Sequence, residues 1–356
     1  MKIRYLLFPF SFFFGIITFI RRKLYKKGII ASYTPPLPVI GIGNLRVGGT
    51  GKTPHAEYII RLLDSFRMGF ISRGYGRRTK GYISVNQFVS GITPENIGDE
   101  PMQIHLKYPG VPMAVSEKRS LGIQNLINQY PDLDGIIMDD VYQHLQVSPG
   151  LMILLTEYGD PYFNDHLLPA GNLRESVSAA GDADIVLVTK TPSAITENEK
   201  SIFRQRLKLR PSQYCFFSTY IYKEPVPKNE KAFTTELSED TPVILLTGIA
   251  KPDSLYHYLS TRYSDIRHFR FPDHHSFTLS DIEKIQHYIA RQNWNNYLLV
   301  TTEKDYMRLS GFKKIISLLP VFVMEIEVHI LDEEKKFNTL IQDYVRKNSK
   351  NSFFSE

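Results

Sequence analysis

One stretch near the N-terminus decides the fold: Val39-Ile-Gly-Ile-Gly-Asn44, then Leu-Arg-Val, then Gly48-Gly-Thr-Gly-Lys-Thr53-Pro54. An apolar strand runs into a glycine-rich turn, and Pro54 stands where a helix opens. Glycines let backbone N–H groups converge on phosphate oxygens, and the helix N-terminus adds its positive dipole end. Lys52 supplies a charge for the β- and γ-phosphates, and Thr53 is suited to ligate Mg²⁺. The stretch predicts a site for a nucleoside triphosphate, made by Val47, Gly48, Gly49, Thr50, Gly51, Lys52 and Thr53.

The loop departs from the usual G-x-x-x-x-G-K-S/T pattern at one place, because Arg46 stands where the first glycine belongs. The alternative interpretation is a glycine-rich turn that only joins a strand to a helix. A later segment bears on the base of the nucleotide. A guanine-reading loop needs Asp two residues after a lysine such as Lys190, and Pro192 stands there instead. We therefore expect ATP as the cofactor rather than GTP.

Short apolar runs alternate with amphipathic stretches, as in a doubly wound, largely parallel sheet of the P-loop NTPase type. We expect strands at 39–42, 69–72, 111–115, 135–138, 152–155 and 185–188, with helices at 54–66, 102–107 and 118–129. The strand Gly135-Ile-Ile-Met138 ends in Asp139 and Asp140, the position of the acidic Mg²⁺ partner in such proteins. Either aspartate alone could be a surface acid in a turn, but the pair beside a phosphate loop favours metal binding.

A second, smaller α/β set follows, with strands expected at 243–246, 266–269 and 297–300 and helices at 254–263 and 281–291. The β-prone segments 214–222 and 321–328 bracket this set, and we expect them to pair as a two-stranded hinge. The expected domains are a membrane helix over 1–28, a kinase core over 29–225 and a smaller domain over 226–345. With 356 residues, 42% of them hydrophobic, and a single cysteine, the chain is long enough for two cores and requires no oxidising compartment.

The formal net charge of +6 is concentrated at the N-terminus, where residues 1–56 carry nine basic side chains and no acid precedes Glu57. A nucleic-acid-binding protein would more often spread its charge over a folded face, so we expect no nucleic-acid partner. Residues 5–20 form an apolar run of about 24 Å as a helix, short of a roughly 30 Å hydrocarbon core. Five cations follow: Arg21, Arg22, Lys23, Lys26 and Lys27. We expect a helix lying in the membrane interface with these cations against anionic headgroups, and keep a true span, a signal peptide and a buried core helix as alternatives.

The ordered motifs resemble the tetraacyldisaccharide 4′-kinase family of Gram-negative bacteria over nearly the whole chain. The matching pieces are the Phe-rich N-terminus with Arg21-Arg22, the loop 39–54, Ser72-Arg-Gly-Tyr-Gly-Arg77, Gly98-Asp-Glu-Pro101, Asp139-Asp140 with Gln143-His144, Leu168-Pro-Ala-Gly-Asn-Leu-Arg-Glu175, Phe271-Pro-Asp-His-His275 and Thr301-Thr-Glu-Lys-Asp305. The loop that lacks its first glycine is part of the resemblance. One departure is Val141-Tyr142, where the family usually has a glycine after the paired aspartates.

The resemblance implies transfer of the γ-phosphate of ATP to the 4′-hydroxyl of a tetraacylated glucosamine disaccharide 1-phosphate, which gives lipid IVA. It implies a lipid A precursor and a membrane surface as partners, at the cytoplasmic face of the inner membrane, with no protein partner evident. A sugar hydroxyl needs help to lose its proton, so we expect a carboxylate–histidine pair. Asp99 is the candidate base, although an Asp at this place also suits a helix N-cap. The resemblance adds His274 from the second domain, with His275 close behind, although a polar loop before a helix would contain the same residues.

The remaining expected site residues have supporting roles. Lys52, Asp139, Asp140, Arg174 and Glu175 complete the catalytic set, with Thr53, Asp139, Asp140 and Glu175 as the Mg²⁺ ligands and Asn44, Arg73, Arg119, His144 and His275 as substrate contacts. Residues 302–305 receive no role. Two other functions stay open at this point, a membrane-associated P-loop ATPase without a lipid acceptor and a soluble nucleotide kinase with an incidental apolar N-terminus.

Overall fold

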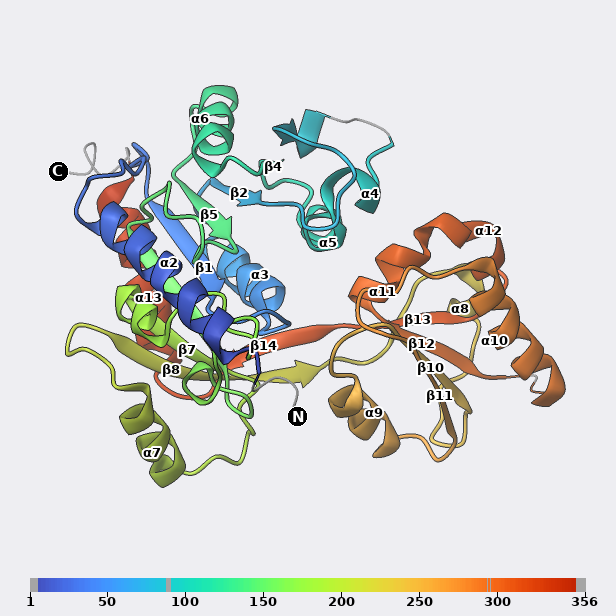
Figure 1. The fold of residues 1–356 in the computed structure, drawn as a ribbon. Coiled ribbons are helices and arrows are strands. Elements are labelled where there is room, and N and C mark those ends of the chain that lie inside the picture. The colour runs from blue at the N-terminus through green and yellow to red at the C-terminus, as the bar shows by residue number, and fades with distance from the viewer. Residues whose placement is uncertain (1–5, 88–90, 293, 295, 350–356) are drawn as a thin grey trace. The chain divides into compact units, whose positions relative to one another are not determined.

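The computed structural model describes residues 6–87, 91–292, 294 and 296–349 and divides the chain into two compact units (Figure 1). The larger unit comprises residues 1–220 and 328–356, and the smaller unit comprises residues 221–327. The C-terminal helix α13 (Glu334–Asn348) therefore lies in the larger unit, whereas we expected it in the smaller domain. Its buried Phe337, Ile341 and Val345 give the reason, because this apolar stripe packs on the large sheet, where Phe337 meets Phe216.

A nine-stranded sheet organises the larger unit, in the order β14-β8-β7-β6-β1-β5-β2-β4-β3. Its strands are β1 (Val39–Asn44), β2 (Met68–Ser72), β3 (Ile83–Ser84), β4 (Met113–Val115), β5 (Gly135–Asp139), β6 (Leu151–Glu157), β7 (Ile185–Thr189), β8 (Tyr214–Tyr222) and β14 (Ile326–Ile330). The pairs that join β4 to β8 through β2, β5, β1, β6 and β7 are parallel, and β3 is antiparallel to β4. The expected parallel α/β sheet and its six strands are confirmed.

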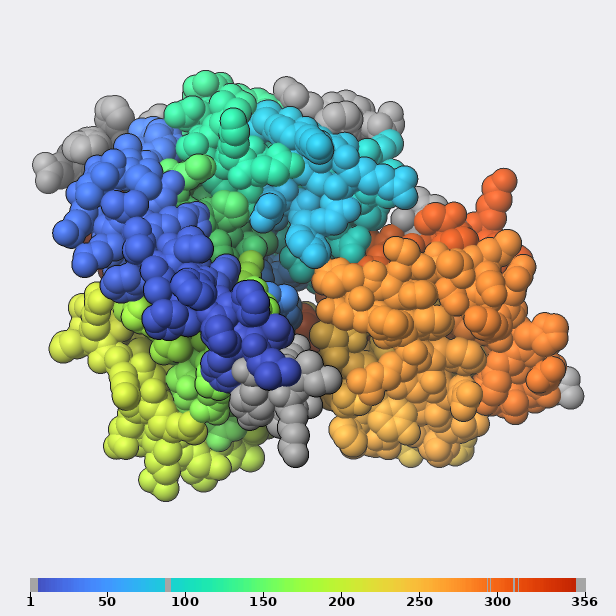
Figure 2. Space-filling view, in the orientation of Figure 1, coloured from blue at the N-terminus to red at the C-terminus, as the bar shows by residue number. Residues whose placement is uncertain are grey.

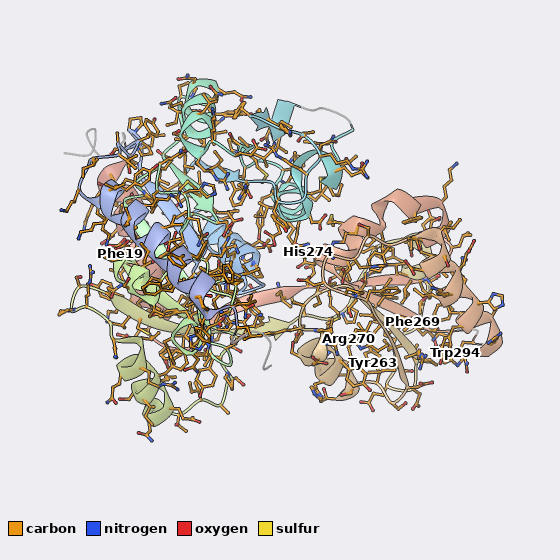
Figure 3. The ribbon with its side chains drawn as sticks, viewed as in Figure 1. Phe19, Tyr263, Phe269, Arg270, His274 and Trp294 are labelled. Atoms are coloured by element: carbon orange, nitrogen blue, oxygen red, sulfur yellow. The ribbon has the colours of Figure 1, made fainter. Side chains whose placement is uncertain are left out.

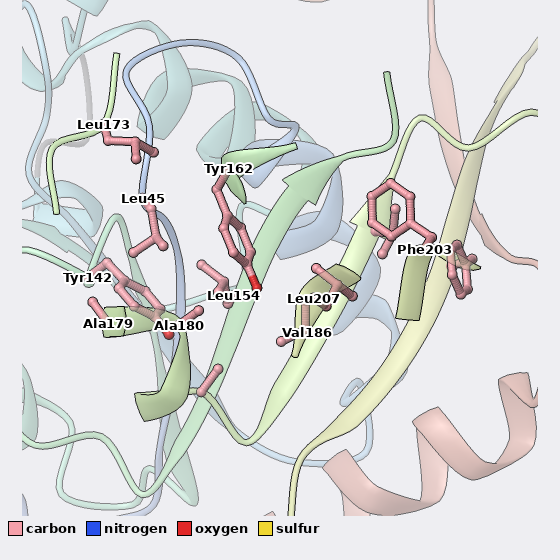
Figure 4. Close-up of a cluster of buried hydrophobic side chains, with 13 residues drawn as sticks. Leu45, Tyr142, Leu154, Tyr162, Leu173, Ala179, Ala180, Val186, Phe203 and Leu207 are labelled. Atoms are coloured by element: carbon pink, nitrogen blue, oxygen red, sulfur yellow. The ribbon is translucent and has the colours of Figure 1, made fainter. Parts of the chain in front are cut away.

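Helices connect these parallel strands, as the right-handed crossover of a parallel pair requires. They are α3 (Lys52–Leu62), α4 (Pro94–Ile97), α5 (Asp99–Lys107), α6 (Arg119–Gln129) and α7 (Glu197–Leu207), with short 3₁₀ turns η1 (Val85–Gln87), η2 (Tyr162–Asn164) and η3 (Val177–Asp182). Beneath η2 and η3, one apolar cluster joins Leu45, Tyr142 and Leu173 to Phe203 on α7 (Figure 4). This cluster packs the loop after β1, the loop after β5 and the segment 167–183 against one another.

The smaller unit contains a five-stranded sheet in the order β11-β10-β12-β13-β9. Its strands are β9 (Val226–Pro227), β10 (Val243–Thr247), β11 (Ile266–Arg270), β12 (Leu298–Thr302) and β13 (Val321–Met324), and its helices are α8 (Glu230–Phe233), α9 (Asp253–Ser260), α10 (Leu279–Gln292), α11 (Glu303–Arg308), η4 (Leu309–Phe312) and α12 (Lys313–Ile316). The three strands and two helices expected from the sequence are all present. Trp294, the single tryptophan of the chain, packs against Tyr288 and Tyr297 in this unit (Figure 3).

The expected two-stranded hinge is only partly right. β8 and β14 are neighbours at the edge of the large sheet, and the chain passes between the units along these two strands. Residues 321–324, which we expected in the same hinge strand, form β13 of the smaller sheet instead. All four of its side chains are buried there, and Glu325 separates the two strands, so the apolar run 321–328 serves two sheets.

Helix α2 (Phe8–Lys26) lies on the surface of the larger unit, where Figure 2 shows it in blue. Ser11 fixes one end of it, since its hydroxyl donates to Leu167 O at 2.9 Å and accepts from Ala170 N at 2.9 Å. Large apolar side chains on the other face are exposed, and Phe10, Phe13, Ile17 and Ile20 form one stripe at helical spacing, each at least 50% exposed. Tyr5, the start of the expected apolar run, lies outside the described residues. Among the residues described, no helix combines the length and apolarity needed to cross a bilayer.

Candidate active site

The glycine-rich loop connects the end of β1 to the first residue of α3, Lys52, as the sequence predicts. Gly51 has φ +90°, and a Cβ at this position would lie 1.7 Å from the hydroxyl oxygen of Tyr220 on β8. Only glycine fits both the backbone conformation and this approach. Gly51 therefore makes the sharp turn by which the chain leaves the loop and enters α3, so the N-terminus of α3 faces the loop.

Three side chains hold the carbonyl oxygens of the loop. Lys190 Nζ donates to Gly49 O at 2.6 Å, and Thr189 Oγ1 donates to Thr50 O at 2.9 Å. His55 Nδ1 lies 2.7 Å from Gly51 O, and burial lowers the pKa of His55 to about 4, so the ring is neutral at pH 7. Because a carbonyl only accepts, His55 donates from Nδ1, and its Nε2 accepts from the Ser218 hydroxyl at 2.9 Å.

Arg46 stands where the usual first glycine belongs, and its side chain pairs with acidic residues outside the glycine-rich loop 48–53. Its guanidinium forms ion pairs with Asp160 and with Asp165, the latter at 2.9 Å. The backbone on either side of it bonds the segment after β6, because Val47 N donates to Asn172 O and Arg174 N donates to Leu45 O. These contacts hold residues 45–47 against the segment 172–174, and a glycine at position 46 would lack the two ion pairs.

The paired aspartates stand at the end of β5 next to the loop, as expected. Asp140 Oδ1 lies 3.5 Å from Lys52 Nζ, and the guanidinium of Arg174 donates to both oxygens of Asp140, at 2.8 and 3.2 Å. Burial would raise the pKa of Asp140, but Lys52 and Arg174 outweigh burial and hold its pKa well below the usual range. Asp140 is therefore a fixed negative charge between two cations.

Asp139 has a different environment. It is buried, its Oδ2 accepts weakly from Ser72 Oγ at 3.5 Å, and its Oδ1 has no hydrogen-bond partner among the described residues. Burial, and then the nearby charge of Glu100, raise the pKa of Asp139 well above its usual value. A buried carboxylate oxygen of this kind is costly unless a cation or proton meets it.

Two of the expected substrate contacts are buried supports. Asn44 is fully buried and bridges Thr50 Oγ1, at 2.9 Å, and Arg174, whose Nη2 donates to Asn44 Oδ1 at 2.6 Å. Arg119 is 1% exposed, and its guanidinium donates to the backbone oxygens of Ser116 and Asp139. The expectation that they touch substrate does not agree with this burial, because their donors are already directed at the framework of the site.

Two other expected contacts lie at the surface of the site. Arg73 is exposed in the turn after β2, and His144 is half-buried in the turn after β5. Burial, followed by the charge of Arg119, lowers the pKa of His144 to about 4, with Asp140 and Arg73 also acting on it. His144 is therefore a neutral ring beside Asp140.

Glu175, which the sequence places among the metal ligands, forms a buried ion pair in the structure. Its Oε2 accepts from Arg22 Nε of helix α2 at 3.2 Å, and the carboxylate is buried. Glu175 thus forms an ion pair with Arg22, whereas its neighbour Arg174 pairs with Asp140. Arg22 is likewise 9% exposed, so the expectation that it meets lipid headgroups is wrong for this arginine.

Asp99 is the first residue of helix α5, and Gly98 is the N-cap. The Asp99 side chain therefore does not occupy the capping position that the alternative interpretation required. A Cβ at Gly98, which has φ +95°, would lie 2.8 Å from Tyr75 O and 3.2 Å from the Gly74 Cα, so the two turns pack directly together. This contact brings the segment 98–100 to the same edge of the sheet as Asp139, whose pKa Glu100 raises.

In the smaller unit, His274 lies in the loop after β11 and is 45% exposed at its side chain (Figure 3). Its Nδ1 lies 3.1 Å from Arg308 Nη2, and because a guanidinium only donates, Nδ1 accepts and the neutral ring carries its proton on Nε2. His275 differs from its neighbour. It contacts Asp281 Oδ2 at 3.0 Å and stacks on Phe271, which is a structural arrangement.

The motif 302–305, to which the sequence assigned no role, supports the His274 loop. Asp305 is fully buried and accepts from Gly248 N at 2.9 Å and from Thr302 Oγ1 at 2.8 Å. Arg308 then connects Asp305, Gly248 O and His274. Sequence reasoning missed Arg308, and the only signal was its place on the same helix face as Asp305, one turn later.

The glycine-rich loop between β1 and α3, the acidic pair at the end of the neighbouring strand β5 and the mostly parallel sheet define a P-loop-like α/β fold. A family profile described as LpxK, tetraacyldisaccharide-1-P 4′-kinase, matches residues 3–346. The tetraacyldisaccharide 4′-kinase of Bacteroides thetaiotaomicron is 40% identical, covering 100% of this chain and 97% of the relative, and that of Flavobacterium johnsoniae is 41% identical, covering 97% and 98%. The crystal structure of the "apo" form of LpxK from Aquifex aeolicus in complex with ATP superposes with a TM-score of 0.71 at 26% identity, covering 96% of this chain and 99% of the other.

The chain therefore belongs to the tetraacyldisaccharide 4′-kinase family, as the sequence motifs indicate. It is a kinase of lipid A biosynthesis.

Proposed function

We propose that this kinase transfers the γ-phosphate of ATP to the 4′-hydroxyl of a tetraacylated glucosamine disaccharide 1-phosphate at the site built around Lys52 and Asp140. The observation that carries the proposal is the juxtaposition of Lys52, Asp140 and Arg174, with Lys52 Nζ at 3.5 Å and Arg174 Nη2 at 2.8 Å from Asp140 Oδ1. The loop amides of residues 48–53 would bind the phosphates, and Lys52 would neutralise charge on the β- and γ-phosphates.

Mg²⁺ fits the same residues. Oδ1 of Asp139 is buried and accepts no hydrogen bond from any described residue, so a cation would stabilise it. Asp140 and the Thr53 hydroxyl lie on the adjoining segments. No group of three or more His, Cys, Asp or Glu side chains suited to a metal occurs in the part of the chain that the structure describes. This agrees with Mg²⁺, which commonly takes one or two carboxylates and completes its shell with substrate phosphates and water. When bound, Mg²⁺ neutralises charge that develops on the transferred phosphoryl group. Glu175, the other ligand expected from the sequence, pairs with Arg22 through Oε2.

For the acceptor, we propose Asp99 of the larger unit as the group that takes the proton of the attacking hydroxyl. In the smaller unit, we propose His274 rather than His275 as the catalytic histidine. The exposed ring of His274, whose tautomer Arg308 fixes, supports His274 over His275. His275 is committed to Asp281 within its own unit. Arg73, exposed at the end of β2, is the proposed contact for an anionic group of the substrate.

The lipid acceptor also gives α2 a role. We propose that its exposed apolar stripe lies in the interface of the cytoplasmic leaflet of the inner membrane, so that the enzyme meets its substrate where the acyl chains are. Replacing Phe13 and Ile17, which are 64% and 65% exposed, by serine should weaken sedimentation with anionic phospholipid vesicles at least about tenfold. Ile202→Ser on α7, which is 50% exposed, is the matched control and should bind vesicles normally. Unchanged sedimentation of the double variant would contradict the interfacial role.

The activity test is a detergent-solubilised assay with γ-labelled ATP, Mg²⁺ and tetraacyldisaccharide 1-phosphate. We expect label in the lipid, lost on Lys52→Ala. Label that appears only as free phosphate would instead support the alternative of an ATPase without a lipid acceptor.

A further inference from the structure

Two consecutive arginines of helix α2 contact the turn that follows the paired aspartates. Arg21 Nη2 donates to the carbonyl oxygen of Gln143 at 2.8 Å, and Arg22 Nη2 donates to that of Tyr142 at 2.9 Å. The Arg22 guanidinium also lies over the Tyr142 ring, 5.7 Å from its centroid. The turn begins directly after Asp140, so α2 determines where the backbone goes as it leaves the acidic pair.

A second connection reaches the same aspartate from the other side. Arg22 Nε donates to Glu175 at 3.2 Å, and the preceding residue, Arg174, donates to both oxygens of Asp140. Gln143 links the turn back to the end of β1, because its Nε2 donates to Asn44 O at 3.1 Å. α2 therefore touches both segments that position Asp140.

Arg22 is buried, so its guanidinium serves these protein contacts rather than the solvent. It is 9% exposed, and its charge is balanced by Glu175 and by Asp182, the latter at 2.6 Å from Nη1. A buried charge with hydrogen-bonded partners is costly to leave unpaired and cannot serve a lipid headgroup at the same time. Lys23 and Lys27 on the same segment are exposed, so the surface cations of α2 are distinct from this inward pair.

We propose that Arg21 and Arg22 are positioning residues for the acidic pair, which makes α2 part of the framework of the active site as well as a membrane contact. The inference rests on the proposed function in one respect, the role of Asp139 and Asp140 as the metal carboxylates. It adds that displacement of α2 from the larger unit would weaken metal binding. The turn 141–144 and the segment 172–175 would then lose their contacts with Arg21 and Arg22.

The test separates positioning from anchoring. Arg22→Gln removes the contacts to Tyr142 and Glu175, and Arg346→Gln, on the exposed surface of α13, is the matched control. Mn²⁺ binding in the presence of a non-hydrolysable ATP analogue, followed by electron paramagnetic resonance, reads the site without turnover. We expect Arg22→Gln to lower Mn²⁺ affinity and kcat in detergent about 10- to 100-fold, as loss of the partners that orient a metal ligand does elsewhere. Sedimentation with anionic vesicles should change less than twofold.

Two further variants test the same contacts independently of Arg22→Gln. Arg21→Gln removes a single hydrogen bond from a half-buried arginine and should show the same effects in weaker form, even if Arg22→Gln fails to fold. Glu175→Gln should lower Mn²⁺ affinity, and the double variant with Arg22→Gln should be no worse than the stronger single one, because the two residues act through one contact. Unchanged Mn²⁺ affinity in all variants, or a loss confined to vesicle binding, would overturn the inference. A wild-type enzyme that binds Mn²⁺ but places no label in the lipid would instead contradict the proposed function.

Discussion

Lys190 and Gly49 are joined across the larger unit, with Lys190 Nζ 2.6 Å from the Gly49 carbonyl oxygen and equally 2.6 Å from Glu157 Oε1. Lys190 has φ +54°, so the backbone after β7 is bent into the left-handed region to aim this side chain at the nucleotide loop. Lys190 thus supports the glycine-rich loop, which agrees with the absence of a guanine-reading pattern around it.

Lys190→Met should therefore weaken ATP binding. A hydrogen bond to a charged group contributes about 1.5–3 kcal/mol, so we expect the KM for ATP to rise about tenfold or more with a smaller change in kcat. Steady-state kinetics over a range of ATP concentrations measure this. Lys208→Met is the control, because Lys208 is a surface lysine that also has positive φ, and its variant should behave as wild type. An unaltered KM in Lys190→Met would show that the loop keeps its shape without the brace.

Asp99→Asn should reduce kcat by about 10²–10⁴, because general-base catalysis of that size is lost when the carboxylate cannot accept a proton. ATP affinity should stay close to wild type, since Asp99 opens α5 and lies outside the loop 48–53. Single-turnover transfer of label to the lipid, together with nucleotide binding, separates the two quantities. Glu95→Gln on the adjacent α4 is the control. A normal kcat in Asp99→Asn would remove Asp99 from the role of base.

The two adjacent histidines should give opposite phenotypes. His274→Asn, in which asparagine accommodates the φ of +60°, should lower kcat and leave the unfolding midpoint nearly unchanged. His275→Asn should lower the stability of the smaller unit, because it removes the contact to Asp281 and the stacking on Phe271 at 4.6 Å between ring centroids. Fluorescence of Trp294, the single tryptophan, reports unfolding of this unit. The reverse pattern would transfer the proposed role from His274 to His275.

Asp281 makes the smaller unit sensitive to acid. Burial would raise the pKa of Asp281, but hydrogen bonds from His275 and Thr278 lower it to about 2. Because the folded pKa is depressed below the unfolded value of about 3.9, the stabilisation is complete above pH 4 and is lost as the pH falls toward 2. Urea unfolding followed by Trp294 fluorescence should show that Asp281→Asn lowers the free energy of unfolding by about 1–2 kcal/mol at pH 7. The difference from wild type should shrink between pH 4 and pH 2, and a constant difference would contradict the assignment.

Much of the fold could be predicted because its signals are local. The apolar runs that became β1, β5 and β7 are continuous and short, as strands covered on both faces must be, and the loop 48–53 follows the first of them at once. The prediction of one hinge strand over 321–328 was wrong because it also rested on a local signal alone. Propensity showed that it was extended, but the division into β13 and β14 depends on which sheet each half meets, and propensity carries no such information.

The candidate site divides in the same way. The sequence by itself determined where the glycine-rich loop joins β1 to the helix that begins at Lys52, and that Asp139 and Asp140 end β5. It also determined the apolar N-terminal helix. Each of these features lies in neighbouring residues, whose backbone geometry follows from glycine, proline and strand periodicity. Only the tertiary structure decided that Arg46 pairs with Asp160 and Asp165, that Arg119 is buried beneath Asp139, and that Arg22 holds Glu175. In each case the partners are 20 to 153 residues apart in sequence, and they meet only because the fold brings the segments that contain them together around the large sheet. A charged side chain far along the chain has no local signal for its partner, so burial and sheet order, rather than residue type, decide whether it contacts substrate or supports the residues that do.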